Sequence, residues 1–263
     1  MKKSTKIWVS IAIISIIIGS LIFVTTMSIL KWDIKKLSTS NFETNVYEFG
    51  EDVSNISINV ITADVTFTVS TYNKTTVTCF EDEKAKHSVT VENGTLLIKE
   101  NDERSLFDKF GVNFTSPKIT VSLPEVELNQ IVIETTTADV CLQDISASTL
   151  NIKTTTGEIC VKNSSFSGEV KVVVTTGDIE LNSVYGGKID LKSTTGDVEL
   201  DYVDGGEIYI KTTTGDVSGS ILTDKKFIAN TTTGDVEVPR NTDGGICQVK
   251  TTTGDIELRI KRP

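Results

Sequence analysis

A short motif recurs along the second half of the chain at a nearly constant spacing, and this repeat limits the folds that are open to it. Thr-Thr-Gly-Asp or a close variant returns every 19 or 20 residues, with its glycine at Gly157, Gly177, Gly196, Gly215, Gly234 and Gly254. Ala138 takes the glycine position in a seventh copy, and Thr62-Ala63-Asp64 is a divergent eighth. Such a period indicates one short supersecondary unit that is repeated along an axis.

Apolar and polar side chains alternate on both sides of each motif. Around Gly196, Ile189 and Leu191 come before the motif, and Val198 and Leu200 follow it. A period of two predicts a half-buried strand on each side, and the unit is too short to add a long helix. The sequence therefore predicts an all-β fold, a single-stranded parallel β-solenoid whose 19–20-residue coils stack about 4.8 Å apart.

The motif itself predicts a tight bend. Continued alternation places the threonines three and one before the glycine inside, as with Thr212 and Thr214, where their hydroxyls satisfy buried groups. Glycine permits the bend and aspartate accepts backbone N–H groups there. Alanine in a left-handed conformation costs about 1 kcal/mol, so the bends at Ala63 and Ala138 are expected to differ. The pair Gly186-Gly187 and its equivalents predict a second bend.

The N-terminal segment predicts a membrane span. Residues 7–30 contain no charged side chain, and 24 helical residues at about 1.5 Å each cross a ~30 Å hydrocarbon core. The segment is longer than the core of a signal peptide and ends in a weak cleavage site, and Trp8 and Trp32 flank it at interfacial positions. We expect an uncleaved signal anchor, one transmembrane helix at 7–30 between a short cytoplasmic tail (1–6) and a linker (31–45).

The remaining residues are expected to form one β-solenoid domain (46–263) outside the cytoplasmic membrane. It divides into divergent N-terminal coils at 46–130, with an insertion at 100–118, and regular coils at 131–263. Lysines flank the span almost equally, so orientation depends on the short N-terminal tail, which favours a cytoplasmic N-terminus. The expected location is the cell membrane, as a single-pass protein with its C-terminal domain extracytoplasmic.

The charge distribution excludes one class of partner. The chain has a net charge of −10, but its first 36 residues hold six lysines against one aspartate. The remainder contains 20 basic and 35 acidic residues and has a net charge of −15. A surface this acidic repels phosphate backbones, so we expect no nucleic acid partner. The membrane, through the N-terminal helix, and an envelope protein or glycan are the partners that remain.

The motif aspartates are the candidate metal ligands. In register they stack along one edge: Asp178, Asp197, Asp216, Asp235 and Asp255. Like charges in register repel, and a bound cation such as Ca²⁺ relieves that repulsion. The alternative, which we favour, is that each aspartate caps its own bend and no metal binds. The glycine-rich nonapeptide of calcium-binding β-rolls does not occur in the sequence.

Nothing in the sequence predicts catalysis or a cofactor. A polysaccharide-active enzyme on a parallel β-helix needs irregular carboxylates and bases in a groove. Here the carboxylates belong to the repeat, and His87 is the only histidine. We therefore predict no catalytic residues and no cofactor, and consider a polysaccharide enzyme the less favoured alternative.

The four cysteines differ in their expected environments. Cys79 and Cys247 fall on inward positions and are interpreted as small apolar core residues. Cys141 and Cys160 lie 19 residues apart on outward positions, which puts them on neighbouring coils about 4.8 Å apart. This separation lies in the disulfide range, so a Cys141–Cys160 disulfide is a hypothesis.

The repeat is interrupted between residues 98 and 119. Leu106, Phe107 and Phe110 share one face of a short predicted helix in this interval. In one interpretation the helix caps an open end of the solenoid, which otherwise exposes strand edges. In the other, the rings stay exposed and dock a partner or the bilayer surface.

Several of these features together resemble a known family. They are the lone N-terminal span, the opening at 58–65, Glu92-Asn93-Gly94-Thr95-Leu96, Val121-Ser122-Leu123-Pro124-Glu125 and the Thr-Thr-Gly-Asp repeats. Over residues 45–260 the chain is similar to the bacterial DUF4097 β-strand-repeat proteins, called "putative adhesins", as a membrane-anchored member. The resemblance implies the repeat architecture and an interaction or scaffold role in the cell envelope. It supplies no catalytic residues. The alternative function is a cation- or glycan-binding module that uses the stacked motif aspartates, here called the aspartate ladder.

Overall fold

The computed structural model describes residues 3–33, 41–50, 52–70, 72, 74–103 and 115–261. The chain divides into two units, residues 1–41 with 104–115 and residues 42–103 with 116–263. The first unit contains helix α1 (Lys3–Ile29), and its segment Thr5–Ile29 has a mean hydropathy of 2.7 and suffices to cross a membrane. The chain therefore has the expected N-terminal candidate transmembrane helix, of a kind found in membrane anchors and in signal peptides.

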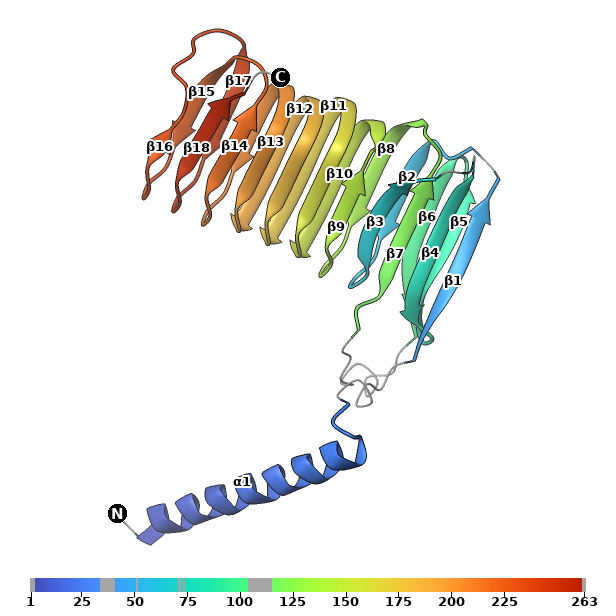
Figure 1. Cartoon of the computed structure of the whole chain (residues 1–263), viewed down its shortest axis with the longest axis vertical. Helices are drawn as coiled ribbons and strands as arrows, with labels where there is room; N and C mark the ends of the chain where they lie inside the picture. Colours follow the sequence, from blue (N-terminus) through green and yellow to red (C-terminus); the bar gives the residue numbers. More distant parts are fainter. Residues whose placement is uncertain are drawn as a thin grey trace. The chain divides into compact units, whose positions relative to one another are not determined.

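The second unit is almost entirely β-structure (Figure 1). Its strands in the described residues are β1 (Phe42–Phe49), β2 (Asn55–Asn59), β3 (Asp64–Val69), β4 (Thr75–Asp82), β5 (Ala85–Glu92), β6 (Thr95–Asp102), β7 (Lys118–Leu123), β8 (Glu127–Glu134), β9 (Val140–Gln143), β10 (Ser146–Thr156), β11 (Ile159–Thr176), β12 (Ile179–Thr195), β13 (Val198–Lys211), β14 (Val217–Ile221), β15 (Lys225–Asn230), β16 (Val236–Glu237), β17 (Gly245–Lys250) and β18 (Ile256–Ile260).

Pairing arranges these strands in two rows. The first row runs β1–β4–β7–β3–β9, continues through the first halves of β11, β12 and β13, and ends β14–β18–β16. The second row runs β5–β6–β2–β8–β10, continues through the second halves of β11, β12 and β13, and ends β17–β15. From β7 and β6 onward, neighbours in the rows are parallel.

The repeat period sets the register in the regular part. Ile179 pairs with Val198 in the first row and Ile189 with Ile208 in the second, both 19 residues apart. The inward positions are aliphatic: Ile189, Leu191, Val198 and Leu200 are fully buried, as the alternation predicted. These side chains belong to one apolar core that extends through both rows.

The last two coils are stacked in the opposite order to the sequence. β17 lies between β13 and β15, and β18 lies between β14 and β16. The expectation that successive repeats stack in sequence order is wrong here. Every repeat has the same apolar pattern, so the pattern fits either order equally well.

The first coil is displaced in the same way. β2 pairs with both β6 and β8, and β3 pairs with both β7 and β9. The earliest parallel strands of the chain therefore lie inside the sheet, covered on one side by β6 and β7.

Parallel coils throughout residues 46–130 were also a wrong expectation. β1 pairs with β4, β4 with β7, and β5 with β6, all antiparallel. The reason is local, because β4 and β5 are joined by the two residues Glu83 and Lys84, and β5 and β6 by Asn93 and Gly94. Loops this short connect only antiparallel strands, and Asn93 and Gly94 have the positive φ angles (50° and 72°) of a type I′ turn.

The repeated bends need glycine because neighbouring coils approach closely. Gly196 has φ 142°, and a Cβ added to it would lie 2.1 Å from the carbonyl oxygen of Gly177. Ala138 is not among the residues with positive φ, so its bend does differ from the glycine bends. Thr212 is buried and its hydroxyl donates to the Gly196 carbonyl oxygen at 3.4 Å, whereas Thr214 is exposed, contrary to expectation.

In the middle coils the second turn is not at the glycine pairs, whereas Gly244, with φ 92°, does lie in a bend just before β17. β12 runs through Gly186 and Gly187 without a break. Instead, left-handed residues that are not glycine recur a few residues earlier, with φ of 48–58° at Asp144, Asn163, Ser183 and Tyr202. Each of these positions holds a backbone conformation that costs a non-glycine residue on the order of 1 kcal/mol.

Candidate functional site

The motif aspartates stack along the bends as predicted, and each contacts the next coil. The backbone N–H of Asp197 donates to Oδ1 of Asp178 at 2.7 Å, and that of Asp216 donates to Asp197 in the same way. The series continues through Asp255 to Asp235, following the order of the coils in space. One carboxylate oxygen in each of these four contacts is thus occupied by a charge-assisted hydrogen bond within the fold, although the side chains remain exposed.

The two outward cysteines lie together. Cys141 of β9 and Cys160 of β11 are register partners, and their sulfur atoms are 3.0 Å apart as free thiols. Burial and the hydrogen bond with Cys141 raise the pKa of Cys160 to about 12. Their disulfide stays a prediction. Leu106, Phe107 and Phe110 lie outside the described residues, and the capping and docking interpretations of that segment stay predictions as well.

A groove of about 630 Å³ lies along the corner where the coils turn from the first row to the second. Exposed apolar side chains line it, with Tyr185 51% exposed, Val126 44% and Val69 41%. Acidic and polar residues complete the lining, among them Glu125, Asp144 and Asn163. The sequence does not predict this groove, because its lining comes from different coils that only the fold brings together.

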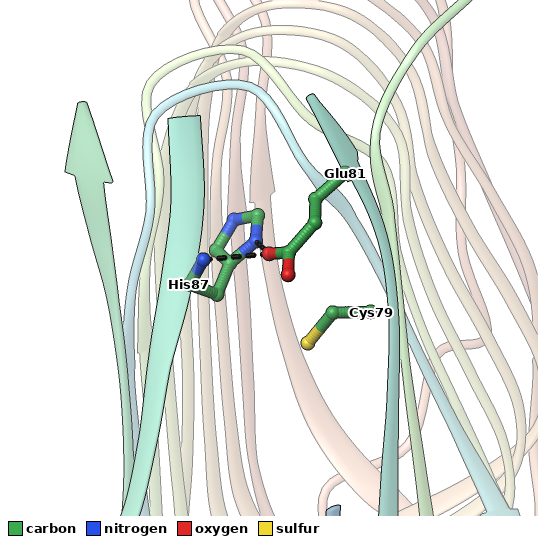
Figure 2. Close-up of side chains that lie close together, drawn as sticks. All are labelled: Cys79, Glu81 and His87. Carbon is green, nitrogen blue, oxygen red and sulfur yellow. Dashed lines mark hydrogen bonds and ion pairs between the residues drawn. The ribbon is translucent and has the colours of Figure 1, made fainter. Parts of the chain in front are cut away.

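A buried polar cluster lies between β4 and β5 (Figure 2). Glu81 is fully buried and His87 is 3% exposed. Oε2 of Glu81 accepts hydrogen bonds from the backbone N–H of His87 and from its Nδ1, both at 2.6 Å. Oε1 accepts from Nδ2 of Asn45 on β1 at 2.7 Å. A carboxylate with three donors is well satisfied even in the protein interior.

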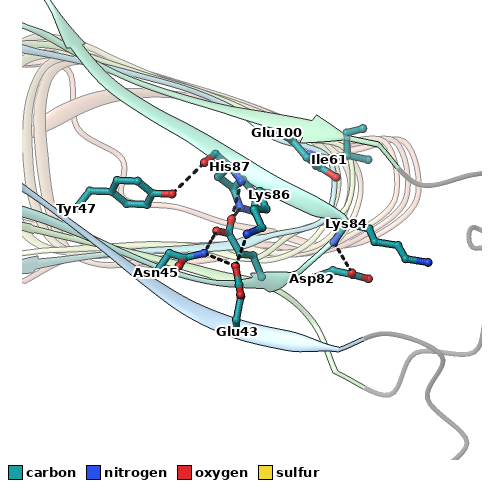
Figure 3. Close-up of polar contacts among 10 residues, drawn as sticks. Glu43, Asn45, Tyr47, Ile61, Asp82, Lys84, Lys86, His87 and Glu100 are labelled. Atoms are coloured by element: carbon teal, nitrogen blue, oxygen red, sulfur yellow. Dashed lines mark hydrogen bonds and ion pairs between the residues drawn. The ribbon is translucent and has the colours of Figure 1, made fainter.

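Further polar contacts surround this cluster and connect β1 with β5 (Figure 3). Nζ of Lys86 lies 2.6 Å from Oε1 of Glu43, and this contact raises the pKa of Lys86 and lowers that of Glu43. The hydroxyl of Tyr47 donates to the carbonyl oxygen of His87 at 3.4 Å. Desolvation and the nearby Glu81 raise the pKa of Tyr47. Strands β1, β4 and β5 are therefore tied together across the two rows.

Cys79 completes the cluster. It lies two residues before Glu81 on the same buried face of β4, and ligand atoms of Cys79, Glu81 and His87 lie within 4.8 Å of one another. Burial raises the pKa of the Cys79 thiol to about 12, with a further contribution from Glu81. Nε2 of His87 is buried and has no hydrogen-bond partner among the residues that the structure describes.

From the sequence, Cys79 is interpreted as a core residue and no role is predicted for His87. The available signal was the spacing of Cys79 and Glu81 on one strand face, followed by His87 across a two-residue turn. That signal becomes informative only when β4 and β5 are recognised as a hairpin.

Comparison with known proteins identifies relatives of this fold. A family model described as Toastrack DUF4097 matches residues 53–262. A solved structure described as a "putative lipid binding protein" from Parabacteroides distasonis has a TM-score of 0.49 and 16% identity, covering 84% of this chain and 98% of its own. A "putative adhesin" from Bacteroides fragilis has a TM-score of 0.46 and 14% identity, covering 84% and 99%. A search of curated proteins found no match.

Proposed function

Because the chain belongs to the Toastrack DUF4097 family, we propose that it is an adhesin-like interaction or scaffold protein of the bacterial cell envelope, and not an enzyme. In this proposal α1 is an uncleaved, single-pass anchor, and the two rows of strands form a parallel β-solenoid that is held outside the cytoplasmic membrane.

The observation that carries the proposal is the groove beside Tyr185. It combines exposed aromatic and aliphatic side chains with carboxylates and an amide, and the stacked strands hold it on a rigid scaffold. Exposed apolar and aromatic side chains gathered on a rigid scaffold are typical of binding surfaces, because such exposure contributes little to the stability of the fold. The net charge of −15 beyond residue 36 favours a neutral or basic envelope partner over a phosphate polymer.

Substitution of the groove tests this proposal. Tyr185→Ser with Val126→Ser is expected to leave the melting temperature within a few degrees of the parent, because both side chains are about half exposed. The same variant should lose the envelope partners that cross-link to the parent in intact cells. Ile228→Ser with Ile246→Ser, two exposed positions outside the groove lining, is the matched control and should keep them. Equal cross-linking by both variants would contradict the role of the groove.

The membrane topology needs a separate test. A reporter enzyme that is active only outside the cytoplasm, fused to the C-terminus, should be active, and its activity should remain with membranes after washing. Activity of a cytoplasm-only reporter would contradict the proposed orientation. Release of the active fusion into the medium would show that α1 is cleaved as a signal peptide.

A glycan- or cation-binding module is the second candidate. The groove favours a glycan, because an exposed tyrosine beside carboxylate and amide groups provides a stacking face and hydrogen-bonding partners for a sugar. A neutral oligosaccharide that raises the melting temperature of the parent but not of the Tyr185→Ser, Val126→Ser variant would support it. For the aspartate ladder the probe is Ca²⁺, and no shift in melting temperature at millimolar Ca²⁺ would count against cation binding.

A further inference from the structure

Three side chains with different metal-binding atoms converge inside the β region. The thiol of Cys79, the carboxylate of Glu81 and the imidazole of His87 place one ligand atom each within 4.8 Å of the other two (Figure 2). All three residues are buried. We propose that Cys79, Glu81 and His87 bind one zinc-like divalent metal ion.

The local fold explains why these three side chains meet. Cys79 and Glu81 are two residues apart on β4, so they point to the same face of the strand. The chain then reverses at Glu83 and Lys84, and β5 brings His87 opposite that face. Two strands joined by a two-residue turn hold the ligands with little freedom, which lowers the entropic cost of binding.

The distances require only small side-chain movements. Ligands about 2.0–2.3 Å from a tetrahedral zinc ion lie roughly 3.3–3.7 Å from one another. The contact between Nδ1 of His87 and Oε2 of Glu81 must therefore open by about 1 Å from its 2.6 Å, and the sulfur atom, which lies within 4.8 Å of both other ligand atoms, must approach by at most about 1.5 Å.

The protonation changes also balance. With Glu81 as a carboxylate, which only accepts, the metal-free contact places the proton on Nδ1 of His87. Metal binding through Nδ1 moves that proton to Nε2, the ring nitrogen that lacks a partner, and releases the thiol proton of Cys79 to solvent. The thiolate and the carboxylate then neutralise the two positive charges of the ion, so the site is buried without net charge.

Nε2 of His87 accepts no hydrogen bond within the described residues, so no contact of the ring holds the proton on Nδ1 against the shift that metal binding requires. Cys247 provides the contrast. It is equally buried, its pKa is also raised to about 12, and within the described part of the chain it belongs to no such cluster.

The donor set selects the class of metal. Sulfur and imidazole nitrogen favour Zn²⁺ or Co²⁺ over Ca²⁺ and Mg²⁺, which prefer oxygen. Three protein ligands leave a fourth coordination position for water or a small anion.

Cobalt binding to the full-length protein in detergent tests the proposal. The test uses the Cys141→Ser, Cys160→Ser background, because those two thiols form a second possible sulfur site. Co²⁺ should bind with a stoichiometry of one and give the near-ultraviolet thiolate-to-cobalt charge-transfer band, and added Zn²⁺ should abolish the band and raise the melting temperature. Cys79→Ser in this background should lose the band, whereas Cys247→Ser should keep it.

A further variant keeps the test decisive if Cys79→Ser fails to fold. His87→Gln retains the thiol and should weaken Co²⁺ binding at least tenfold, since a missing ligand leaves only two protein donors. The proposal is overturned if the background protein shows no band with Co²⁺ in excess. It is equally overturned if the band survives Cys79→Ser or His87→Gln unchanged, or if Cys247→Ser removes it.

Discussion

The two ends of the β region share one feature and differ in another. At both ends the parallel strands nearest a chain terminus are inserted one place inward, β2 and β3 behind β6 and β7 at one end, and β17 and β18 behind β15 and β16 at the other. Only the N-terminal end continues further, with the antiparallel strands β1, β4 and β5. No described strand pairs with the outer edges of β15 and β16.

The inward side chains show the consequence. At the C-terminal end Phe227, Ala229 and Val238 are only half-buried, and Val236 is 44% exposed. At the N-terminal end Val77 and Glu81 are fully buried. A terminal coil of parallel strands leaves one side of its interior open, and an added antiparallel hairpin closes it. This closed N-terminal end also holds the buried Glu81–His87 cluster, whose hydrogen bonds are shielded from water there.

The largest effect is expected from an added methyl group at a bend. Gly196→Ala would place Cβ 2.1 Å from the Gly177 carbonyl oxygen, inside a stack with coils on both sides, and should cost at least about 3 kcal/mol of unfolding free energy. Gly234→Ala meets Gly254 at 2.2 Å, but its coil is terminal and can move outward. In urea denaturation, the free energy of unfolding of Gly196→Ala should therefore be well below that of Gly234→Ala. Equal losses would mean that the terminal coil is held as firmly as the middle.

The polar cluster at the closed end is the next largest contributor. Glu81→Ala leaves His87, Asn45 and a backbone N–H without their acceptor and should cost about 3 kcal/mol. Glu43→Ala, which removes the partly exposed partner of Lys86 and of Asn45 but leaves Asn45 its contact with Glu81, should change stability much less and is the matched control. Both can be measured by urea denaturation. A similar, small loss for the two variants would show that the closed end does not depend on the buried carboxylate.

The buried thiols predict a loss of stability at high pH at both ends. In the metal-free protein, burial raises the pKa of Cys79 and of Cys247 from 9 to about 12. Between these values the unfolded thiol releases its proton and the folded one retains it, so stability is fully present below pH 9 and falls as the pH rises toward 12. Each thiol should remove about 1 kcal/mol between pH 9 and 10. Urea denaturation of Cys79→Ala and Cys247→Ala at pH 8 and pH 10 should show a shallower loss than the parent, and an unchanged loss would contradict the assignment.

The smallest predicted effect concerns the left-handed corner of the regular coils. Ser183 has φ 55°, a conformation that glycine adopts without the Cβ penalty. Ser183→Gly should therefore change the unfolding free energy by less than about 1 kcal/mol, in the stabilising direction. Gly177→Ala at the neighbouring bend, where Cβ would lie 2.0 Å from the Gly157 carbonyl oxygen, should strongly destabilise the protein and is the contrasting variant. A destabilised Ser183→Gly variant would mean that the serine side chain outweighs the backbone strain.

The sequence allowed the middle of the β region to be predicted in some detail, because one pattern repeats there. The inward Ile189 and Leu191, the stacked Asp197 and Asp216, and the approach of Cys141 to Cys160 all follow from a 19–20-residue period. The order of the last coils did not follow, since a repeated pattern contains no information on which copy lies beside which.

The closed end was unpredictable for a different reason. Glu81 and His87 are polar residues at inward positions. In the sequence they interrupt the apolar–polar alternation, and nothing there indicates that they contact each other. Only the hairpin between β4 and β5 makes them neighbours, and its two-residue turn, Glu83-Lys84, has no strong turn signature. The groove was missed on similar grounds, because Val126, Asp144 and Tyr185 come from separate coils.

Amide hydrogen exchange, read by mass spectrometry, tests the inserted strand order most directly. We predict that peptides from β17 and β18 (residues 245–260) exchange more slowly than peptides from β15 and β16 (residues 225–237), although they lie nearer the C-terminus. The reason is that β17 and β18 are paired on both sides, whereas β15 and β16 are paired on one. Faster exchange in 245–260 than in 225–237, as expected for coils that fray from the C-terminus, would contradict the account.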